Sequence, residues 1–398
     1  MNKKYKLAVL VSHPIQYQVP LFRLLATHPN IDLTVYFCAD WCTKDDFIDP
    51  GFSVVLKWDI PLLEGYTYKF LPNLCKKTSL SFWGLINPSI IKEILYNRYD
   101  AIWIHGYASL SDWLAFLGAW VSRTPILLRG ESHLINYRPG LKMIFKSVVL
   151  LPLFKAISAF LPIGTLNTAY YKHYGVSGKK MFLTPYCVDN TLFSKWYQAL
   201  HGKREQIKKK LGIQANLSVV LYASKMMPRK RAIDILKAYE TIHDKVSAAV
   251  VFVGDGKERP ALEVYAKQHN LKNVYFAGFK NQTELPEYFA VADVFVLPST
   301  DEPWGLIINE VMNFGLPIIT TDQVGAGPDL VKHGENGFIY PVGDVEKLSN
   351  CLLKLLNDSG LRNTMGNRSL TMINKWSYTE DVEGILSALK YVENKTHD

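Results

Sequence analysis

The sequence predicts an α/β protein made of two doubly wound domains, each with a parallel sheet covered by helices on both faces. Three observations predict this class. Short apolar runs alternate with amphipathic stretches along the 398-residue chain, which is typical of strand–helix–strand units. The alternation starts again after a charged connector near residues 190–215. With 48% hydrophobic and 20% charged residues, the chain has the composition of a globular protein with ample core.

The first half alternates strands with helices. Expected strands are KLAVLVSH (6–13), IDLTVYFC (31–38), YDAIWIHG (99–106), TPILLRGES (124–132) and AISAFLPIG (156–164). Expected helices are PLFRLLATHP (20–29), part of SFWGLINPSIIKEILYNR (81–98), SLSDWLAFLGAWVSR (109–123) and LNTAYYKHYG (166–175). Ser109 or Ser111 is the expected N-cap of the third helix. Residues 40–80 are expected to be irregular.

The second half repeats the pattern. Expected strands are LSVVLYAS (217–224), AAVVFVGDG (248–256), NVYFAGF (273–279), DVFVLPST (293–300) and LPIITT (316–321). Expected helices are RAIDILKAYETIHD (231–244), RPALEVYAKQHNL (259–271), TELPEYFAVA (283–292), PWGLIINEVMNFG (303–315), VEKLSNCLLKLLND (345–358) and two more before the end. In such sheets, ligands bind at the carboxyl ends of the strands, and most simply in a cleft between two such domains.

Composition excludes several classes of protein. Five cysteines, scattered and odd in number, argue against a disulfide framework and for a reducing compartment. Cys38 and Cys42 lack a second pair or a nearby histidine, so a zinc site is not expected. No run of eighteen apolar residues occurs, so no membrane-spanning helix is expected. The apolar run from Leu7 to Val11 is too short for a signal peptide and predicts a buried first strand.

Positive charge is concentrated in the first half. Residues 1–190 hold 20 basic and 12 acidic residues, a net charge of +8, whereas residues 191–398 hold 25 and 24, a net charge of +1. Solubility alone would explain this surplus, and so would an anionic partner or membrane surface; both interpretations stay open. Within 138–163, basic residues stand among apolar ones at Arg138, Lys142, Lys146 and Lys155.

The stretch EPWGLIINE (302–310) follows the buried strand DVFVLPST, so Glu302 is expected at the ligand-facing end of that strand. Gly305 would let a ligand approach the free backbone N–H groups of the following helix. Glu310 stands among apolar residues, where a carboxylate is costly without a partner, and the neighbouring hydroxyls of a ribose would supply one. A helix-capping glutamate plus a solvated or salt-bridged one is the structural alternative.

A second basic motif, SKMMPRKR (224–231), lies on a strand-to-helix turn. Lys225 and Lys230 would suit a diphosphate, because charge-assisted hydrogen bonds strengthen as a diphosphate departs. A generic basic surface loop is the alternative.

Together these residues carry a resemblance to family 4 glycosyltransferases. The ordered set consists of GDG (254–256), FAGF (276–279), VFVLPS, Glu302-x7-Glu310, NFGLPII (313–319) and NGFIYPVGDVEKL (336–348). SKMMPRK resembles the donor-diphosphate turn of the family, YCVDNTLF (186–193) its interdomain segment, and residues 376–392 its closing helix. The start, HPIQYQVPLFR (13–23), resembles a bacterial subset of group 1 enzymes that make polysaccharides.

The resemblance implies a GT-B fold. It implies a Rossmann-like acceptor domain (1–190), a Rossmann-like nucleotide-sugar domain (191–378) and a helix (379–398) that crosses back to the first domain. It also implies sugar transfer with retention from a nucleotide-diphosphate sugar, with no metal or other cofactor, because lysines neutralise the diphosphate. The expected acceptor is a saccharide or lipid-linked saccharide in cell-surface polysaccharide or lipopolysaccharide synthesis. The expected location is the cytoplasm, with peripheral contact at the inner face of the cell membrane.

Carried over by position, the resemblance implies diphosphate contacts from Lys225 and Lys230, donor-sugar contacts from Glu302, and ribose contacts from Glu310. The nucleotide base would lie near Gly278 and Phe279. The backbone of Trp304, Gly305, Leu306 and Ile307 would lie over the donor sugar and the phosphate.

The first half departs more from the family pattern. Ser12-His13-Pro14 replaces the usual paired glycines, which leaves His13 and Gln16 as candidate acceptor contacts. His105 matches a family histidine. Glu131 stands where the family has an active-site histidine, and either pairs with Arg129 structurally or faces the reacting carbons.

The sequence leaves other classes of protein as alternatives to the transferase. A nucleotide-sugar epimerase or sugar phosphorylase would share the fold, and a catalytically silent binding protein would be expected to lose Lys230 or one of the paired glutamates. Nucleic-acid binding is disfavoured because no reader module is present.

Overall fold

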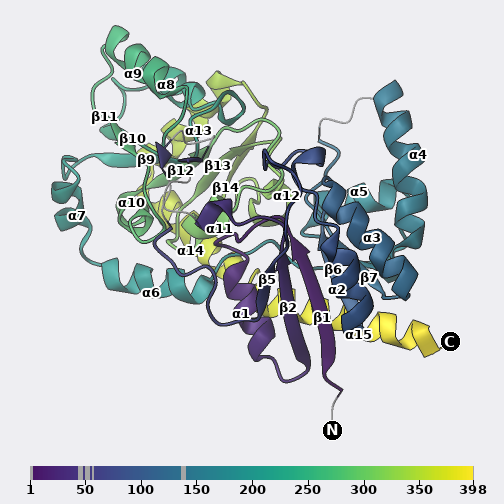
Figure 1. The fold of residues 1–398 in the computed structure, drawn as a ribbon. Helices are drawn as coiled ribbons and strands as arrows, with labels where there is room; N and C mark the ends of the chain where they lie inside the picture. The colour runs from purple at the N-terminus through teal and green to yellow at the C-terminus, as the bar shows by residue number, and fades with distance from the viewer. Residues whose placement is uncertain (1–2, 44–47, 50–53, 56–57, 136–139, 398) are drawn as a thin grey trace. The chain divides into compact units, whose positions relative to one another are not determined.

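The computed structural model describes residues 3–43, 48–49, 54–55, 58–135 and 140–397, and the chain divides into two compact units (Figure 1). Unit 1 comprises Met1–Phe47, Ile60–Tyr186 and Tyr378–Asp398. Unit 2 comprises Ile48–Asp59 and Cys187–Ser377. The last helix therefore groups with the first unit.

Unit 1 is built on a six-stranded sheet of order β5-β2-β1-β6-β7-β8, with every pairing parallel. Apart from the edge strand β5, which is largely exposed, its strands are short, mostly apolar and mostly buried, as continuous apolar runs predict. They are β1 (Tyr5–Val11), β2 (Ile31–Phe37), β5 (Tyr68–Phe70), β6 (Ala101–His105), β7 (Ile126–Arg129) and β8 (Ala159–Phe160).

Helices cover this sheet on both faces. They are α1 (Val19–Thr27), α2 (Ser89–Asn97), α3 (Leu110–Ser122), α4 (Leu141–Ala156), α5 (Thr165–His173) and α15 (Tyr378–His397), with short 3-10 turns η1 (Trp41–Thr43), η2 (Phe82–Gly84) and η3 (Gly178–Lys180). Ser109 caps α3 through a capping box: its hydroxyl accepts from Asp112 N, and the Asp112 carboxylate accepts from Ser109 N. Of the two predicted caps, Ser109 is confirmed.

Unit 2 has a sheet of the same design, ordered β11-β10-β9-β12-β13-β14 and also parallel throughout. The strands are β9 (Ser218–Ala223), β10 (Ala248–Val253), β11 (Val274–Gly278), β12 (Val294–Leu297), β13 (Ile318–Thr321) and β14 (Gly337–Tyr340). A separate antiparallel pair joins β3 (Ile48–Asp49) and β4 (Val54–Val55).

The helices of unit 2 fill the intervals between these strands. They are α6 (Asn190–Leu200), α7 (Arg204–Lys210), η4 (Pro228–Lys230), α8 (Ile233–Glu240), α9 (Arg259–Gln268), α10 (Leu285–Val291), α11 (Ile307–Met312), α12 (Gly327–Leu330), α13 (Val345–Asn357) and α14 (Ser359–Ile373). Each unit buries its own apolar core against its sheet. The predicted α/β class with two doubly wound parallel sheets is confirmed.

Two local predictions are wrong. The helix expected over 303–315 is only the six-residue α11, because Gly305 has a φ of +95° and Gly315 a φ of +66°, which are not helical values. Glu310 therefore lies in the first turn of α11, earlier than expected. Residues 40–80, expected to be irregular, contribute the edge strand β5. No helix in the described part of the chain is both long and apolar enough to cross a membrane.

Candidate functional site

The order of the strands in unit 2 reverses between β9 and β12, which pair at Val220↔Val294 and Leu221↔Phe295. At such a point the loops leaving two neighbouring strands run to opposite faces of the sheet and open a crevice. The loop after β9 carries Lys225 and Lys230, and the loop after β12 carries Glu302. The predicted diphosphate turn and the predicted sugar-binding glutamate thus lie at the same edge of one sheet.

Lys230 and Glu302 form a buried ion pair across this crevice. The Lys230 ammonium donates to Glu302 Oε2, and each residue is 7% exposed. The more exposed Arg229 reaches the same oxygen at 3.5 Å. Burial lowers the pKa of the Lys230 ammonium below its ordinary value, and the attraction of Glu302 offsets only part of that effect. Two cationic groups therefore converge on one carboxylate in a poorly hydrated place.

The backbone of the Glu302 loop is fixed by close contact with the loop after β13. Glu302 N donates to Gln323 O at 3.1 Å, and Gly325 N donates to Glu302 O at 2.8 Å. A Cβ on Gly325 would lie 1.8 Å from the Pro303 carbonyl oxygen, so only glycine allows this approach. Asp301 has a φ of +53°, which turns the chain sharply before Glu302.

The Trp304 side chain is packed inside unit 2. It is 4% exposed, donates from Nε1 to Asn309 Oδ1 at 2.9 Å, and stacks on Trp376 with ring centroids 5.6 Å apart. Gly305 follows in a left-handed conformation, Leu306 is the N-cap and Ile307 is the first helical residue of α11. A ligand in this place would thus meet backbone groups.

Glu310 is buried among apolar neighbours, as predicted. It is 9% exposed, burial raises the pKa of its carboxyl to about 8, and Oε2 has no hydrogen-bond partner within the described structure. Glu310 lines a cavity of about 130 Å³. The remaining lining residues are Ala223, Ser224, Val253, Gly254, Phe279, Lys280, Leu285 and Ile307. A buried carboxyl with an unpartnered oxygen beside a cavity is a candidate binding group.

The other predicted donor residues surround the same edge. Gly278 ends β11 with a φ of +72°, and its carbonyl accepts from Gly254 N at 2.8 Å. Phe279 lines the Glu310 cavity beside Lys280, a cation that the sequence analysis missed although it directly follows the quoted FAGF motif. Lys225 directly follows Ser224 of this cavity, and its carbonyl accepts from Tyr222 Oη at 2.9 Å.

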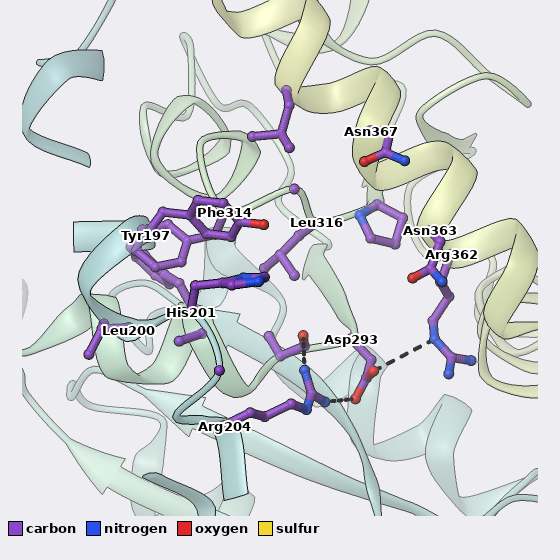
Figure 2. A pocket seen from close by; sticks show the side chains of 17 residues that line it. Tyr197, Leu200, His201, Arg204, Asp293, Phe314, Leu316, Arg362, Asn363 and Asn367 are labelled. Carbon is purple, nitrogen blue, oxygen red and sulfur yellow. Dashed lines mark hydrogen bonds and ion pairs between the residues drawn. The ribbon is translucent and has the colours of Figure 1, made fainter. Parts of the chain in front are cut away.

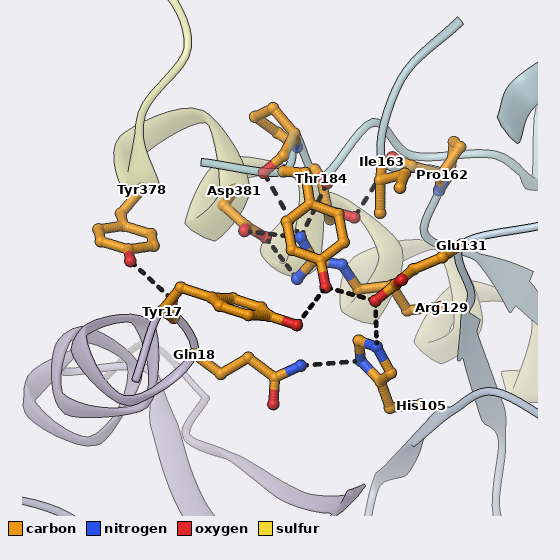
Figure 3. A network of polar contacts seen from close by, with 12 residues as sticks. Tyr17, Gln18, His105, Arg129, Glu131, Pro162, Ile163, Thr184, Tyr378 and Asp381 are labelled. Carbon is orange, nitrogen blue, oxygen red and sulfur yellow. Dashed lines mark hydrogen bonds and ion pairs between the residues drawn. The ribbon is translucent and has the colours of Figure 1, made fainter. Parts of the chain in front are cut away.

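A polar network in unit 1 gathers residues from four parts of the chain (Figure 3). Tyr186 Oη donates its single proton to Glu131 Oε1 at 2.5 Å and lies 2.8 Å from Tyr17 Oη, whose hydroxyl can donate to it. His105 joins the network through both of its ring nitrogens. Its Nε2 lies 3.7 Å from Glu131 Oε1, and its Nδ1 lies 3.5 Å from Gln18 Nε2. Burial favours the neutral acid, but His105, Tyr186 and Arg129 outweigh it and lower the pKa of Glu131. The network therefore holds a carboxylate.

Arg129 is buried and binds groups far along the chain. It is 4% exposed and binds the carboxylate of Asp381 in α15 at 3.1 Å, as well as the Thr184 carbonyl at 3.1 Å. Glu131 contacts His105 and Tyr186, and the positive charge of Arg129 also helps to lower its pKa. Arg129 ties the last helix to the end of β7 (Figure 3).

His13 and Gln16 lie in the loop between β1 and α1. His13 Nδ1 is 2.9 Å from Ser12 Oγ, and its ring lies 5.1 Å from that of Trp41. Gln16 Oε1 is buried without a hydrogen-bond partner among the described residues. Two residues of the same segment, Tyr17 and Gln18, belong to the polar network around Glu131. Neither was predicted as a site residue, although both stand in the quoted HPIQYQ motif.

A separate cavity of about 600 Å³ lies at the opposite edge of the unit 2 sheet, where β12 and β13 begin (Figure 2). Asp293 in its wall binds Arg204 and also lies 3.7 Å from Arg362 Nε. One carboxylate thus faces two guanidinium groups, and none of the predicted site residues lines this cavity. Among the described residues, no three His, Cys, Asp or Glu side chains are arranged to hold a metal ion.

Part of the chain is similar to a known protein family. Residues 203–372 match the family model described as glycosyl transferases group 1. The names of the relatives agree with that match. These findings show that residues 203–372 are similar to the group 1 glycosyl transferases. The alternatives of an epimerase and of a silent binding protein are not favoured.

Two relatives show how far the similarity extends. N-acetyl-α-D-glucosaminyl L-malate synthase of Bacillus anthracis is 31% identical over 182 residues, which are 45% of this chain and 47% of that protein. UDP-Gal:α-D-GlcNAc-diphosphoundecaprenol α-1,3-galactosyltransferase of Escherichia coli is 26% identical over 79% of this chain and 81% of its own. The chain covers less than half of the length of the curated relatives that it matches first.

The solved structure of Anabaena HepE in complex with UDP has a TM-score of 0.73, is 18% identical, and aligns over 97% of this chain and 99% of its own. A likeness at this identity concerns the fold, and the predicted GT-B fold is confirmed by it.

Proposed function

We propose that this protein is a retaining glycosyltransferase that moves a sugar from a nucleotide-diphosphate donor to a saccharide or lipid-linked saccharide during cell-surface polysaccharide synthesis. The observation that carries the proposal is Glu310, a buried carboxyl with an unpartnered oxygen that lines a cavity at the strand-order reversal of unit 2. A ribose presents two neighbouring hydroxyls, which suit such a carboxylate. The matching family model over residues 203–372 supports this interpretation.

In this proposal the donor spans the crevice between the loops after β9 and β12. Glu310 binds the ribose, and Gly278 and Phe279 border the base. Lys225 and Lys230 bind the diphosphate, so that no metal ion is needed to neutralise it. Glu302 then exchanges part of its contact with Lys230 for donor-sugar hydroxyls. The backbone of Trp304, Gly305, Leu306 and Ile307 lies over the sugar and the phosphate.

The chemistry proposed for this arrangement is one displacement at the anomeric carbon. The bond from that carbon to the diphosphate oxygen breaks with its electron pair on the oxygen, and the acceptor hydroxyl oxygen bonds to the same face. The acceptor proton passes to a diphosphate oxygen. Charge grows on the diphosphate as the bond breaks, so the two lysines stabilise the transition state more than the ground state.

The acceptor side is proposed to lie in unit 1, where Glu131 and His105 present a carboxylate and an imidazole to saccharide hydroxyls. His13 and Gln16 are further acceptor contacts in the proposal. Arg129 is buried against Asp381, so we assign it the support of this network rather than contact with the acceptor. The Escherichia coli relative, named for a diphosphoundecaprenol-linked acceptor, supports a lipid-linked acceptor and a location at the inner face of the cell membrane.

A thermal-shift screen against UDP, GDP, ADP and their sugar conjugates, without added metal, tests the proposal. A ligand that binds only the folded state raises the melting temperature. One nucleotide is expected to stand out and to lose its effect in the Lys230→Ala variant. If none of these nucleotides shifts the melting temperature, the proposed donor site is wrong.

A further inference from the structure

The outward face of α4 is apolar. Six of its large side chains are between 42% and 75% exposed: Leu141, Ile144, Phe145, Val148, Val149 and Leu151. Their spacing of three and four residues places them along one side of the helix. The opposite side packs into the core of unit 1 through Leu150, Leu153 and Phe154, the last lying 5.7 Å from the ring of Tyr171. The helix is thus apolar both toward the core and toward solvent.

This distribution differs from an ordinary surface helix, in which lysines would face solvent. Lys146 turns inward, with its ammonium 5.1 Å from the centre of the Tyr170 ring, and burial lowers its pKa. Lys155 alone of the described α4 lysine side chains is exposed on the apolar side, near the end of the helix. Arg138, also singled out by the sequence, lies outside the described residues. Exposed apolar area of this extent marks a contact surface.

The two units differ in this respect. Of the nineteen large hydrophobic side chains that are exposed among the described residues, all but Val264 belong to unit 1. Three of them, Leu117, Trp120 and Val121, lie near the end of α3. Figure 1 shows α4 on the outer side of unit 1, with α3 and α5 on its inner side. The apolar surface is therefore a property of one unit.

A basic hollow lies where α3, α4 and α15 end. It has a volume of about 410 Å³, and Trp120 and four cationic side chains line it: Arg123, Lys155, Lys180 and Lys395. None of its described lining residues is acidic. Lys180 donates to the Ile157 carbonyl at 2.9 Å, whereas Arg123 and Lys155 have no ion-pair partner in the described part of the chain. Lys395 lies 5.1 Å from the centre of the Tyr391 ring, and all four cations keep their positive charge without a carboxylate among the described residues that line this hollow.

We propose that the exposed face of α4 and this basic hollow together bind the surface of an anionic lipid bilayer. The apolar side chains of α4 would enter the interfacial region, and the hollow would receive the phosphate of a lipid headgroup beside Trp120. Apolar area and positive charge act together in such contacts. The inference deepens the proposed function and rests on it only in naming a lipid-linked saccharide as the acceptor.

Vesicle flotation with the full chain tests the surface. The probes are vesicles of phosphatidylcholine alone and of phosphatidylcholine mixed with phosphatidylglycerol. The protein is expected to float with the mixed vesicles at low salt and to remain largely unbound with the neutral ones. Phe145→Ser should lower the partition coefficient about tenfold or more, because a large apolar side chain no longer enters the lipid. Lys155→Gln should lower it about fivefold.

Two substitutions on α9 of unit 2 are matched controls, because Val264 and Lys267 are likewise exposed. Val264→Ser and Lys267→Gln should leave flotation unchanged. All four variants change exposed side chains, so their melting temperatures should equal that of the parent.

Three outcomes would overturn the inference: no flotation with anionic vesicles, equal loss in the α9 controls, or a dimer in solution that Phe145→Ser dissociates. The last would assign the face to a second copy of this chain. Flotation is measured without nucleotide, and the nucleotide-induced thermal shift is measured without vesicles. Failure of one proposal is therefore distinguishable from failure of the other.

Discussion

Lys230 donates to Glu302 across the ends of two neighbouring strands, and both side chains are buried. Arg229 reaches the same Glu302 oxygen at 3.5 Å, so cations outnumber carboxylates around the pair. A diphosphate would add negative charge beside Lys230, and a sugar hydroxyl would offer Glu302 a new partner. The pair is thus placed to exchange one set of partners for another when a donor binds.

Replacing Lys230 should abolish donor use. We expect Lys230→Ala to lose about 10²-fold or more in donor affinity or turnover, because a buried charged contact is removed. Arg229→Ala is the matched control, since this neighbouring cation is 42% exposed in its side chain and should matter much less. Near-normal turnover of both Lys230→Ala and Glu310→Ala, measured with the nucleotide sugar found in the screen, would refute the site assignment.

Stability and catalysis should separate in a double substitution. Lys230→Met leaves the buried Glu302 with only the long contact to the partly exposed Arg229, which should cost at most about 3–5 kcal/mol of unfolding free energy. Adding Glu302→Gln removes the buried charge and should recover much of that loss in a denaturant titration, while activity stays absent. Recovery of activity together with stability would mean that the pair is only structural.

Glu310 should make stability depend on pH. Its pKa is raised by burial to about 8, above its ordinary value of 4.5, so the folded state keeps a proton that the unfolded state loses. Stability relative to Glu310→Gln is therefore greatest below pH 4.5, falls as pH rises from there to about 8, and is level above that. Parallel curves for the two proteins across this range would contradict the prediction.

Binding of the nucleotide donor should release the proton that the Glu310 carboxyl retains. If ribose hydroxyls donate to an ionised Glu310, binding releases the proton that burial retains. The affinity for the nucleotide should then rise with pH up to about 8, by at most about tenfold per pH unit, and become level above it. Isothermal titration calorimetry in buffers of different ionisation enthalpy counts the protons directly. Glu310→Gln, at the same position, should release none.

The apolar pattern of the sequence predicts the strands well, because continuous apolar runs bounded by turn residues leave few alternatives in a parallel sheet. It also predicts that Glu302 and Lys230 follow the carboxyl ends of strands, whereas the pairing of β9 with β12 is what makes them neighbours. The partners of Arg129 were not predictable in this way. Asp381 stands 252 positions away, and nothing local marks it as the residue that meets the end of β7.

Tyr186 was missed for a related reason. Its aromatic ring suggests core, and the residue is indeed 4% exposed, but its hydroxyl links Glu131 to Tyr17. Both faces of α4 are apolar, so periodicity could not tell which side the core would cover. Only the packing of Phe154 against α5 shows that the side with Phe145 faces out.

The Glu131 network should act on the acceptor alone. Glu131→Gln and Tyr186→Phe each remove a hydrogen bond to a charged group, so we expect the acceptor KM to rise about tenfold or more. The nucleotide-induced thermal shift should be unchanged. Tyr99→Phe, which removes another buried hydroxyl contact in the same unit, is the control and should leave the acceptor KM as it was. A lost nucleotide shift in Glu131→Gln would place this residue on the donor side instead.

The buried ion pair of Arg129 and Asp381 should stabilise the folded protein far more than the exposed ion pair of Lys3 and Glu393, which also involves α15. Both are nearly inaccessible, so Arg129→Met should cost about 3–5 kcal/mol of unfolding free energy and increase hydrogen exchange in α15. Lys3 and Glu393 also join α15 to the start of the chain, but their side chains are 46% and 25% exposed. Glu393→Gln should cost at most about 1 kcal/mol. Equal losses in the two variants would show that α15 is not held by its buried pair.

Gly325 should be required for the shape of the Glu302 loop. A methyl group there would lie 1.8 Å from the Pro303 carbonyl oxygen, a backbone atom that cannot move without displacing Glu302. We expect Gly325→Ala to lower the melting temperature and to remove the nucleotide-induced shift. Gly327→Ala, two residues along the same loop, is the control, because its methyl group would meet only Ile339 Cδ1 at 3.9 Å. A normal nucleotide shift in Gly325→Ala would mean that Glu302 need not be held in this position to bind the donor.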